Sequence, residues 1–139
     1  MPTRIYLVRH GATDLTAEDR FAGSSDVPLS DEGRRQVACL AARLKREKLD
    51  AVYASPLGRT METARTLALP HGLEPIAEAG LREIDYGHWE GLRRSEVEST
   101  FPAEYAAEGP KQDALTASIK EMVARVQGYV PGYGLKSEP

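Results

Sequence analysis

The stretch of this chain best equipped for chemistry is Arg9-His10-Gly11, which directly follows a short apolar run at residues 5–8. An imidazole with an ordinary pKa of about 6.5 is largely neutral near pH 7, so it can act as a nucleophile without a separate base. The adjacent guanidinium is planar and permanently charged, which suits it to anionic oxygens. His10 is therefore a candidate nucleophile and Arg9 a candidate anion-binding residue. Taken alone, a histidine after a strand is more often structural.

Arg59 and Glu83 could supply the remaining groups of a phosphoryl-transfer site. Arg59 falls near the start of an expected helix, where backbone N–H groups and the helix dipole favour an anion, and with Arg9 it could clamp phosphoryl oxygens. Glu83 lies in a loop near Trp89, where partial burial would favour the protonated acid that a leaving alkoxide needs. The simpler alternatives are an Arg59 that caps a helix or pairs with Glu62, and a Glu83 that is a solvated charge.

The apolar pattern predicts an α/β scaffold for these residues. Short apolar runs at residues 5–8, 50–56 and 74–79 are typical of strands. Helices are expected from the N-cap Ser30, from Gly58 to about Pro70, and over residues 115–126. The alternation implies parallel crossovers, so the expected fold is a three-layer α/β/α sandwich with a mostly parallel central sheet. The carboxyl ends of its strands, where ligands bind, would carry His10, Ser55 and Arg59.

The length of 139 residues indicates a single domain over residues 1–139, with an active-site loop at 81–92 and an irregular tail at 128–139. The expected apolar faces are Val37, Leu40, Ala41 and Leu44 on the first helix and Met61, Ala64, Leu67 and Ala68 on the second.

Composition narrows the classes of function. The net charge of −3, with both signs interleaved, gives no basic surface for nucleic acid or an anionic membrane. Cys39 is the only cysteine, so neither an intrachain disulfide nor a cysteine-rich metal site is expected, and no metal or cofactor is predicted. The apolar run at residues 5–8 is far too short for a signal peptide or a membrane span, so a cytoplasmic location is the simplest interpretation.

The chain resembles the histidine phosphatase superfamily, which includes cofactor-dependent phosphoglycerate mutases and many small phosphomonoesterases. Four stretches carry the resemblance in order: LVRHGATD, RFAGSSDVPLSDEGRRQ, YASPLGRTMETA and LREIDYGHWEGL. They cover roughly residues 4–100. The resemblance implies a phosphoglycerate mutase-like fold, with His10 as the phosphorylated nucleophile and Glu83 as proton donor and then base. It further implies that Arg9 and Arg59 bind phosphate, and that Thr16 and Gly23 contact substrate.

The form DYGHWEG is more similar to the phosphatase branch than to the mutases, so hydrolysis of a small phosphate ester is the expected activity. The family's second histidine, which follows a late strand, has no counterpart among the three histidines His10, His71 and His88. Truncation, an altered reading frame or divergence would each give this pattern. Two alternatives therefore stay open: mutase-type phosphoryl transfer, and a phosphate-binding protein without turnover. Absence of the late strand would expose the edge of residues 5–8 and favour a homodimer or aggregation.

Overall fold

The computed structural model describes residues 3–83 and 85–107, and the chain divides into two compact units. One unit is Arg9–Thr100; the other combines Met1–Val8 with Phe101–Pro139. Among the described residues of the second unit, Pro102–Ala106 forms helix α5. The unit Arg9–Thr100 contains α1 (Asp14–Ala17), α2 (Asp31–Leu44), β1 (Tyr53–Ala54), α3 (Gly58–Ala68), β2 (Ile76–Ala77) and α4 (Arg94–Thr100), with 3-10 helices at Leu69–His71, Ala79–Leu81 and Gly87–Trp89. Within the described ranges, no helix is both long enough and apolar enough to cross a bilayer.

Helix α2 begins where the sequence predicts. The Ser30 hydroxyl accepts a hydrogen bond from the Gly33 N–H at 3.1 Å, and two acidic residues occupy the first turn. This arrangement satisfies one of the free N–H groups at the helix start and complements the dipole. Val37, Ala41 and Leu44 are buried on one face, so the predicted apolar stripe is confirmed.

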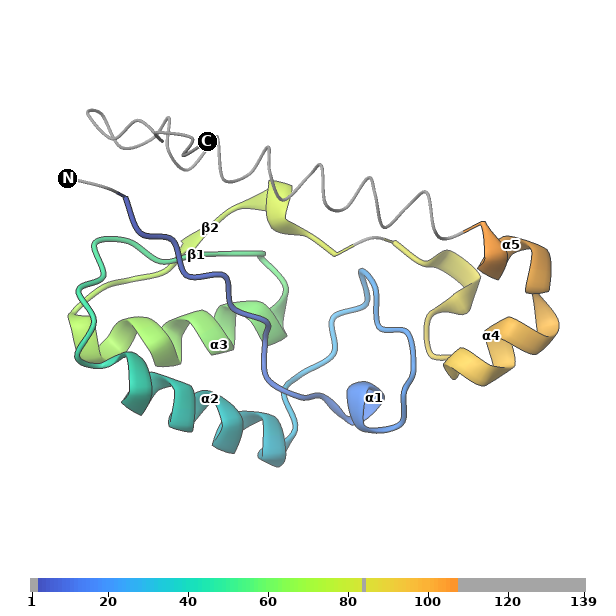
Figure 1. Ribbon diagram of the computed structural model, residues 1–139, viewed down its shortest axis with the longest axis horizontal. Coiled ribbons are helices and arrows are strands. Elements are labelled where there is room, and N and C mark those ends of the chain that lie inside the picture. Colours follow the sequence, from blue (N-terminus) through green and yellow to red (C-terminus); the bar gives the residue numbers. More distant parts are fainter. Residues whose placement is uncertain (1–2, 84, 108–139) are drawn as a thin grey trace, which may run out of the picture. The chain divides into compact units, whose positions relative to one another are not determined.

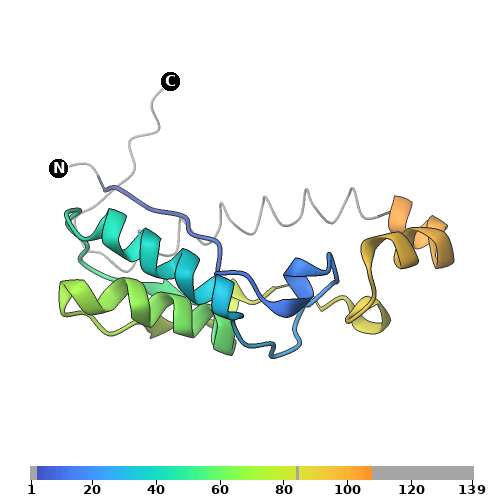
Figure 2. The same ribbon diagram turned by 90° about the horizontal axis from the view of Figure 1, so that it is seen from below.

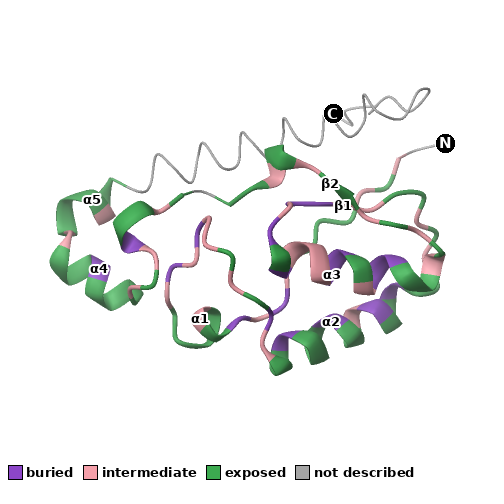
Figure 3. Cartoon of the chain, turned by 180° about the vertical axis from the view of Figure 1, so that it is seen from behind, coloured by how far each residue is buried: buried purple, intermediate pink, exposed green. Residues whose placement is uncertain are grey.

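Helices α2 and α3 lie side by side, as Figures 1 and 2 show from two directions. Their facing sides carry the buried residues, coloured purple in Figure 3. Leu67 from α3 joins Leu29 and the α2 stripe in one apolar cluster. Gly72, with φ of +66°, follows Leu69–His71 and ends the helical segment in the left-handed conformation that glycine adopts readily.

Strands β1 and β2 form a parallel pair, with Tyr53 opposite Ile76 and Ala54 opposite Ala77. The Ile76 N–H donates to the Val52 carbonyl at 2.8 Å, and the Glu78 N–H donates to the Ala54 carbonyl at 2.7 Å. Each strand falls inside its predicted apolar run but covers only two residues of it. Helices combined with a parallel sheet confirm the α/β class.

The prediction of a buried strand at residues 5–8 is wrong. The structure assigns no strand there, and Leu7 and Val8 are exposed by 63% and 41%. An apolar run is compatible with a strand, but only a neighbouring backbone can complete the ladder, and the described residues provide none for this segment. The predicted helix at 115–126 and the predicted tail at 128–139 lie outside the described residues.

Candidate active site

His10 is partly buried, and its ring is held by the backbone beside it. Its Nδ1 lies 2.6 Å from the Gly11 carbonyl oxygen. Because a carbonyl can only accept, Nδ1 carries the hydrogen, and the neutral ring then has its free lone pair on Nε2. Burial lowers the pKa of His10, and the charges of Arg59 and Arg9 lower it further, against opposing contributions from the Gly11 carbonyl and Glu83. The ring therefore favours the neutral, nucleophilic form.

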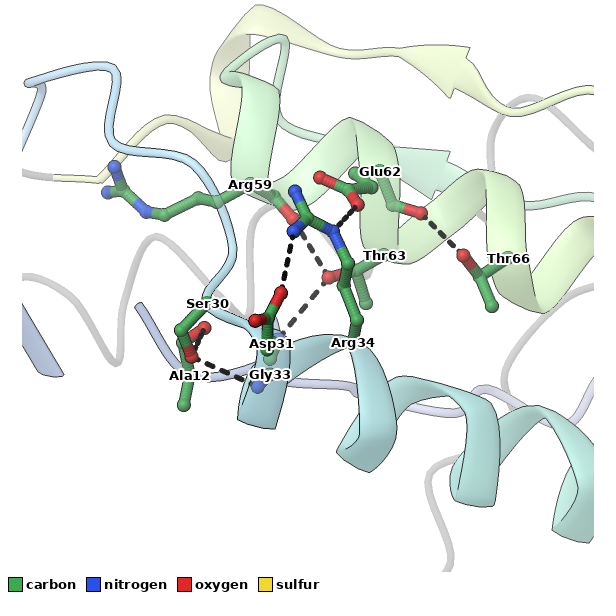
Figure 4. Close-up of polar contacts among 10 residues, drawn as sticks. Ala12, Ser30, Asp31, Gly33, Arg34, Arg59, Glu62, Thr63 and Thr66 are labelled. Atoms are coloured by element: carbon green, nitrogen blue, oxygen red, sulfur yellow. Dashed lines mark hydrogen bonds and ion pairs between the residues drawn. The ribbon is translucent and has the colours of Figure 1, made fainter. Parts of the chain in front are cut away.

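The loop that carries His10 is packed against the start of α2 and the side of α3. The Gly11 N–H donates to the Thr63 hydroxyl at 3.3 Å, and that hydroxyl donates to the Arg59 carbonyl at 2.8 Å. A Cβ on Gly11 would lie 2.6 Å from the Gly33 carbonyl oxygen, so this approach requires glycine. Figure 4 shows Thr63 on α3 facing the first turn of α2, where the Ser30 hydroxyl donates to the Ala12 carbonyl and accepts from the Gly33 N–H.

Arg59 is the most fully buried charged side chain among the described residues, with 1% of its surface exposed. Its Nη1 donates to the Ser25 carbonyl and its Nη2 to the Gly23 carbonyl, each at 2.6 Å. Its Nε–H has no hydrogen-bond partner in the described part of the chain. Two of its five N–H groups are thus used for orientation, and the others remain available to an anion. A buried guanidinium with no carboxylate partner within the described ranges is costly, and a phosphoryl group would offset that cost.

The simpler interpretation of Arg59, an ion pair with Glu62, is wrong. The Glu62 carboxylate instead pairs with Arg34 of α2 at 2.6 Å, and Asp31 lies 3.4 Å from the same guanidinium. Figure 4 shows this cluster between the two helices, with the Arg59 side chain extending away from it. Arg59 is therefore directed to another part of the unit by the carbonyls of residues 23 and 25.

The start of α3 is less available to an anion than its sequence predicts. The Gly58 N–H donates to the Asp26 carboxylate at 2.8 Å, and the Leu57 N–H donates to the Ser55 hydroxyl at 3.4 Å. A side-chain carboxylate thus already occupies this end of the helix. Anion binding here depends on the Arg59 side chain more than on helix N–H groups.

The remaining predicted residues occupy different environments. Gly23 is buried, has φ of +54° and meets Arg59 through its carbonyl, whereas Arg9 is exposed and reaches His10 electrostatically. Thr16 is exposed in α1, where its N–H donates to the Thr13 hydroxyl at 3.1 Å. The structure thus brings Arg9, His10, Arg59 and Gly23 together, while the contacts of Thr16 are to the cap of its own helix.

Glu83 acts on the electrostatics of His10, since its charge raises the pKa of that ring. Its side chain is exposed, so the partial burial expected from Trp89 is not present. Trp89 instead packs in an aromatic group, with ring centroids of Phe21 and Tyr86 at 5.5 and 6.3 Å. An exposed carboxylate can still reach a leaving group, but a bound substrate would have to exclude water from that carboxylate.

Sequence reasoning missed two residues that organise this region, Thr63 and Glu90. Thr63 is buried on α3, where its hydroxyl bonds the His10 loop at Gly11. The Glu90 carboxylate joins the loop of residues 23–26 to the loop of Glu83. Thr63 could have been found, because it is a polar residue on the predicted apolar side of a helix. Glu90 follows a large aromatic residue in a glycine-rich loop, where its sequence context gives little indication of its contacts.

Comparison with known proteins gives a consistent family match. The histidine phosphatase superfamily (branch 1) matches residues 5–132. Phosphoserine phosphatase 1 of Hydrogenobacter thermophilus is 35% identical over 130 residues, which are 94% of this chain and 62% of the relative. The probable phosphoglycerate mutase GpmB of Cronobacter sakazakii is 43% identical over 84 residues, which are 60% of this chain and 39% of the relative. The chain thus spans less than two thirds of the length of these curated relatives.

Solved structures show the same fold. Bacillus stearothermophilus YhfR superposes with a TM-score of 0.78 at 28% identity, covering 90% of this chain and 67% of that one. A mycobacterial glucosyl-3-phosphoglycerate phosphatase, solved in complex with VO3, superposes with a TM-score of 0.66 at 32% identity, covering 70% of this chain and 49% of that one.

Proposed function

The chain belongs to the histidine phosphatase superfamily, and from that premise we propose that it is a phosphomonoesterase acting on a small phosphorylated metabolite. We further propose that the reaction needs no metal and takes place in the cytoplasm. The observation that carries the proposal is Arg59, buried and oriented by two carbonyls, with an Nε–H that no protein group satisfies among the described residues.

In the first step, Nε2 of His10 attacks phosphorus in line with the leaving oxygen. The P–N bond forms, the P–O bond to the alcohol breaks, and Glu83 gives its proton to the departing alkoxide. Arg9 and Arg59 neutralise the charge on the equatorial oxygens. In the second step, the Glu83 carboxylate takes a proton from water, which attacks phosphorus. The P–N bond then breaks, and inorganic phosphate leaves with His10 restored.

The named relatives support a small phosphate ester as substrate. One is a phosphoserine phosphatase and another a glucosyl-3-phosphoglycerate phosphatase, and both names describe phosphorylated metabolites. The complex of the latter with VO3 is in keeping with a site for a phosphate-like anion in that protein. Similarity to the probable mutase GpmB favours, as a second candidate, phosphoryl transfer between positions of a phosphoglycerate.

Hydrolysis of p-nitrophenyl phosphate and phosphoserine, with and without EDTA, tests the proposal. We expect steady release of phosphate that EDTA leaves unchanged, and an acid-labile, alkali-stable phosphoryl label on the protein. His10→Ala should abolish both, whereas the control His71→Ala should retain both. Label of unchanged stability on His10→Ala would rule out the nucleophile assignment.

The alternatives give different results in the same assay. A phosphate-binding protein without turnover would bind vanadate but release no phosphate, and a mutase would interconvert phosphoglycerates faster than it hydrolyses them.

A homodimer is the assembly we propose, because Leu7 exposes 63% of its surface in an apolar run. Light scattering that gives a monodisperse monomer would exclude it.

A further inference from the structure

The Glu90 carboxylate accepts hydrogen bonds from the loop of residues 23–25 and from Tyr86 in its own loop. Its Oε1 accepts from the Ser24 N–H at 2.8 Å, the Ser24 hydroxyl at 3.1 Å and the Tyr86 N–H at 3.2 Å. Its Oε2 accepts from the Ser25 hydroxyl. Burial alone would raise the pKa of Glu90, but the hydrogen bonds from these groups together lower it below the usual value. The carboxylate is therefore ionised and fully used by its neighbours.

The residues that Glu90 holds are those that orient Arg59. The carbonyls of Gly23 and Ser25 each accept a hydrogen bond from the Arg59 guanidinium at 2.6 Å. Ser25 is itself bound by Glu90, and Gly23 directly precedes Ser24, the other serine that Glu90 binds. The path from the Glu90 carboxylate to the buried guanidinium thus runs through one short loop, residues 23–25. Gly23 has φ of +54°, so the loop is a sharply turned segment that needs contacts to fix its carbonyls.

The other partner of Glu90 lies on the loop that carries the candidate acid. Tyr86 follows Glu83 by three residues in sequence, and its backbone N–H shares Oε1 with Ser24. Backbone hydrogen bonds continue this connection, since the Gly91 N–H donates to the Phe21 carbonyl at 2.7 Å and the Phe21 N–H to the Leu92 carbonyl at 3.0 Å. One carboxylate therefore links the phosphate-binding side of the site to its acid side.

We propose that Glu90 is a positioning residue, which fixes residues 23–25 so that their carbonyls aim Arg59 at the phosphoryl group and which holds the loop of Glu83 against them. This inference rests on the proposed function for its catalytic consequence, but the orientation of Arg59 is measurable without turnover. Glu90 acts only through the two loops and contacts no reacting atom.

The choice of variants follows from what each atom of Glu90 does. In Glu90→Gln, the amide oxygen can still accept from the Ser24 and Tyr86 N–H groups, and the amide nitrogen can donate to the Ser25 hydroxyl. Glu90→Ala removes every acceptor and leaves buried donors unsatisfied. Ser25→Ala removes only the hydroxyl bound to Oε2 and serves as the milder variant if Glu90→Ala does not fold. Leu67→Ala, in the apolar cluster between α2 and α3, is the control for lost stability alone.

Two measurements on the whole chain test the proposal: calorimetric titration with inorganic phosphate, and the NMR signal of the buried Arg59 Nε–H. We expect Glu90→Ala to weaken phosphate binding at least ~10-fold and to speed solvent exchange of the Arg59 Nε–H, while Glu90→Gln stays within about threefold of the wild type. Ser25→Ala should change both readouts in the same direction by less. Leu67→Ala should alter neither, even with an equal drop in Tm.

Three results would overturn the proposal: wild-type phosphate affinity and Arg59 protection in Glu90→Ala, a Glu90→Gln variant as impaired as Glu90→Ala, or equal effects from Leu67→Ala. Failure of the proposed function looks different. A wild-type chain that protects the Arg59 Nε–H but hydrolyses no ester would refute the phosphatase assignment and leave the role of Glu90 in place.

Discussion

The loop of the candidate nucleophile, residues 10–13, and the loop of the candidate acid, residues 83–92, are held in different ways. The first is fixed by close backbone contact with α2, where Gly33 approaches Ala12 so nearly that a Cβ would lie 2.0 Å from the Ala12 carbonyl oxygen. The second is held by hydrogen bonds: its Glu90 carboxylate accepts from the backbone N–H groups of Ser24 and Tyr86, and Gly91 and Leu92 pair with the backbone of Phe21. Changes in the packing around the first loop, His10 itself apart, should therefore reduce stability, and changes at the second should reduce activity first.

The largest expected effect concerns Arg59, whose guanidinium is oriented by the carbonyls of Gly23 and Ser25. Arg59→Lys keeps the charge but replaces the planar fork of three nitrogens by a single ammonium, which lacks the spacing that bonds both carbonyls and a phosphoryl oxygen. We expect kcat/KM for p-nitrophenyl phosphate to fall ~10²-fold or more, since loss of one preorganised donor costs about 2.7–4 kcal/mol. Arg65→Lys, on an exposed position of the same helix, is the control and should leave kcat/KM unchanged. An Arg59→Lys variant with the kcat/KM of the wild type would contradict the role of Arg59 in binding the phosphoryl group.

The next effect tests the steric hold on the nucleophile loop. Gly33→Ala would normally favour a helix by about 1 kcal/mol, but here the new methyl group overlaps the Ala12 backbone. We expect a net loss of about 1–3 kcal/mol in the free energy of unfolding, measured by urea denaturation. Gly72→Ala is the comparison, because it has open space and only a φ of +66° to oppose it. A Gly33→Ala variant more stable than the wild type would show that the loop is not tightly packed.

A smaller effect is expected from Ser30→Ala at the junction of this loop with α2. The Ser30 hydroxyl accepts from the Gly33 N–H and donates to the Ala12 carbonyl, both at 3.1 Å. Its loss should lower the free energy of unfolding by about 1 kcal/mol. Arg35→Ala, which removes an exposed ion pair with Glu32, should change it by less than about 0.5 kcal/mol. Equal losses in the two variants would mean that the cap contributes nothing.

The smallest expected effect is a shift in the titration of His10. Burial, with Arg59 and Arg9, lowers its pKa, so the ring stays neutral below the pH at which an exposed histidine takes up a proton. We expect the NMR midpoint of His10, and the acid limb of kcat/KM, to lie below ~6.5. Because the unfolded chain binds this proton first, the contribution of His10 to stability falls as pH drops below that value.

Arg59→Met separates the causes of this shift. Removing the guanidinium should move the His10 midpoint upward, but burial remains, so the midpoint should return only part of the way to the ordinary value. A midpoint that does not move would show that Arg59 lies too far from the ring to act on it.

Sequence reasoning worked for elements whose signals are local. Ser30 and the apolar spacing from Val37 to Leu44 predict α2, because capping and a single buried face are properties of the segment itself. The run at residues 5–8 shows the opposite case. Its apolar character is real, but a strand also needs a partner that the segment does not contain, and the described residues leave Leu7 exposed.

The same distinction applies to the site. Residue type and position identify Arg9, His10 and Arg59 as candidate site residues, and the resemblance adds Glu83 and Gly23 as candidates. Their surroundings were not predictable: Arg59 bonds carbonyls 34 and 36 residues away, and Glu62 pairs with Arg34 rather than with Arg59. Such contacts depend on which loops meet, and no local pattern encodes that.

The sequence by itself therefore determined the family, the α/β class, the helices α2 and α3 and the candidates for the reactive groups, because these follow from motifs and local periodicity. The tertiary structure alone decided that Asp26 occupies the start of α3, that Glu83 is exposed and that Glu90 joins two loops. Hydrogen bonds between residues more than 30 positions apart form only after the loops are brought together, so their partners are chosen by packing and not by the neighbouring sequence.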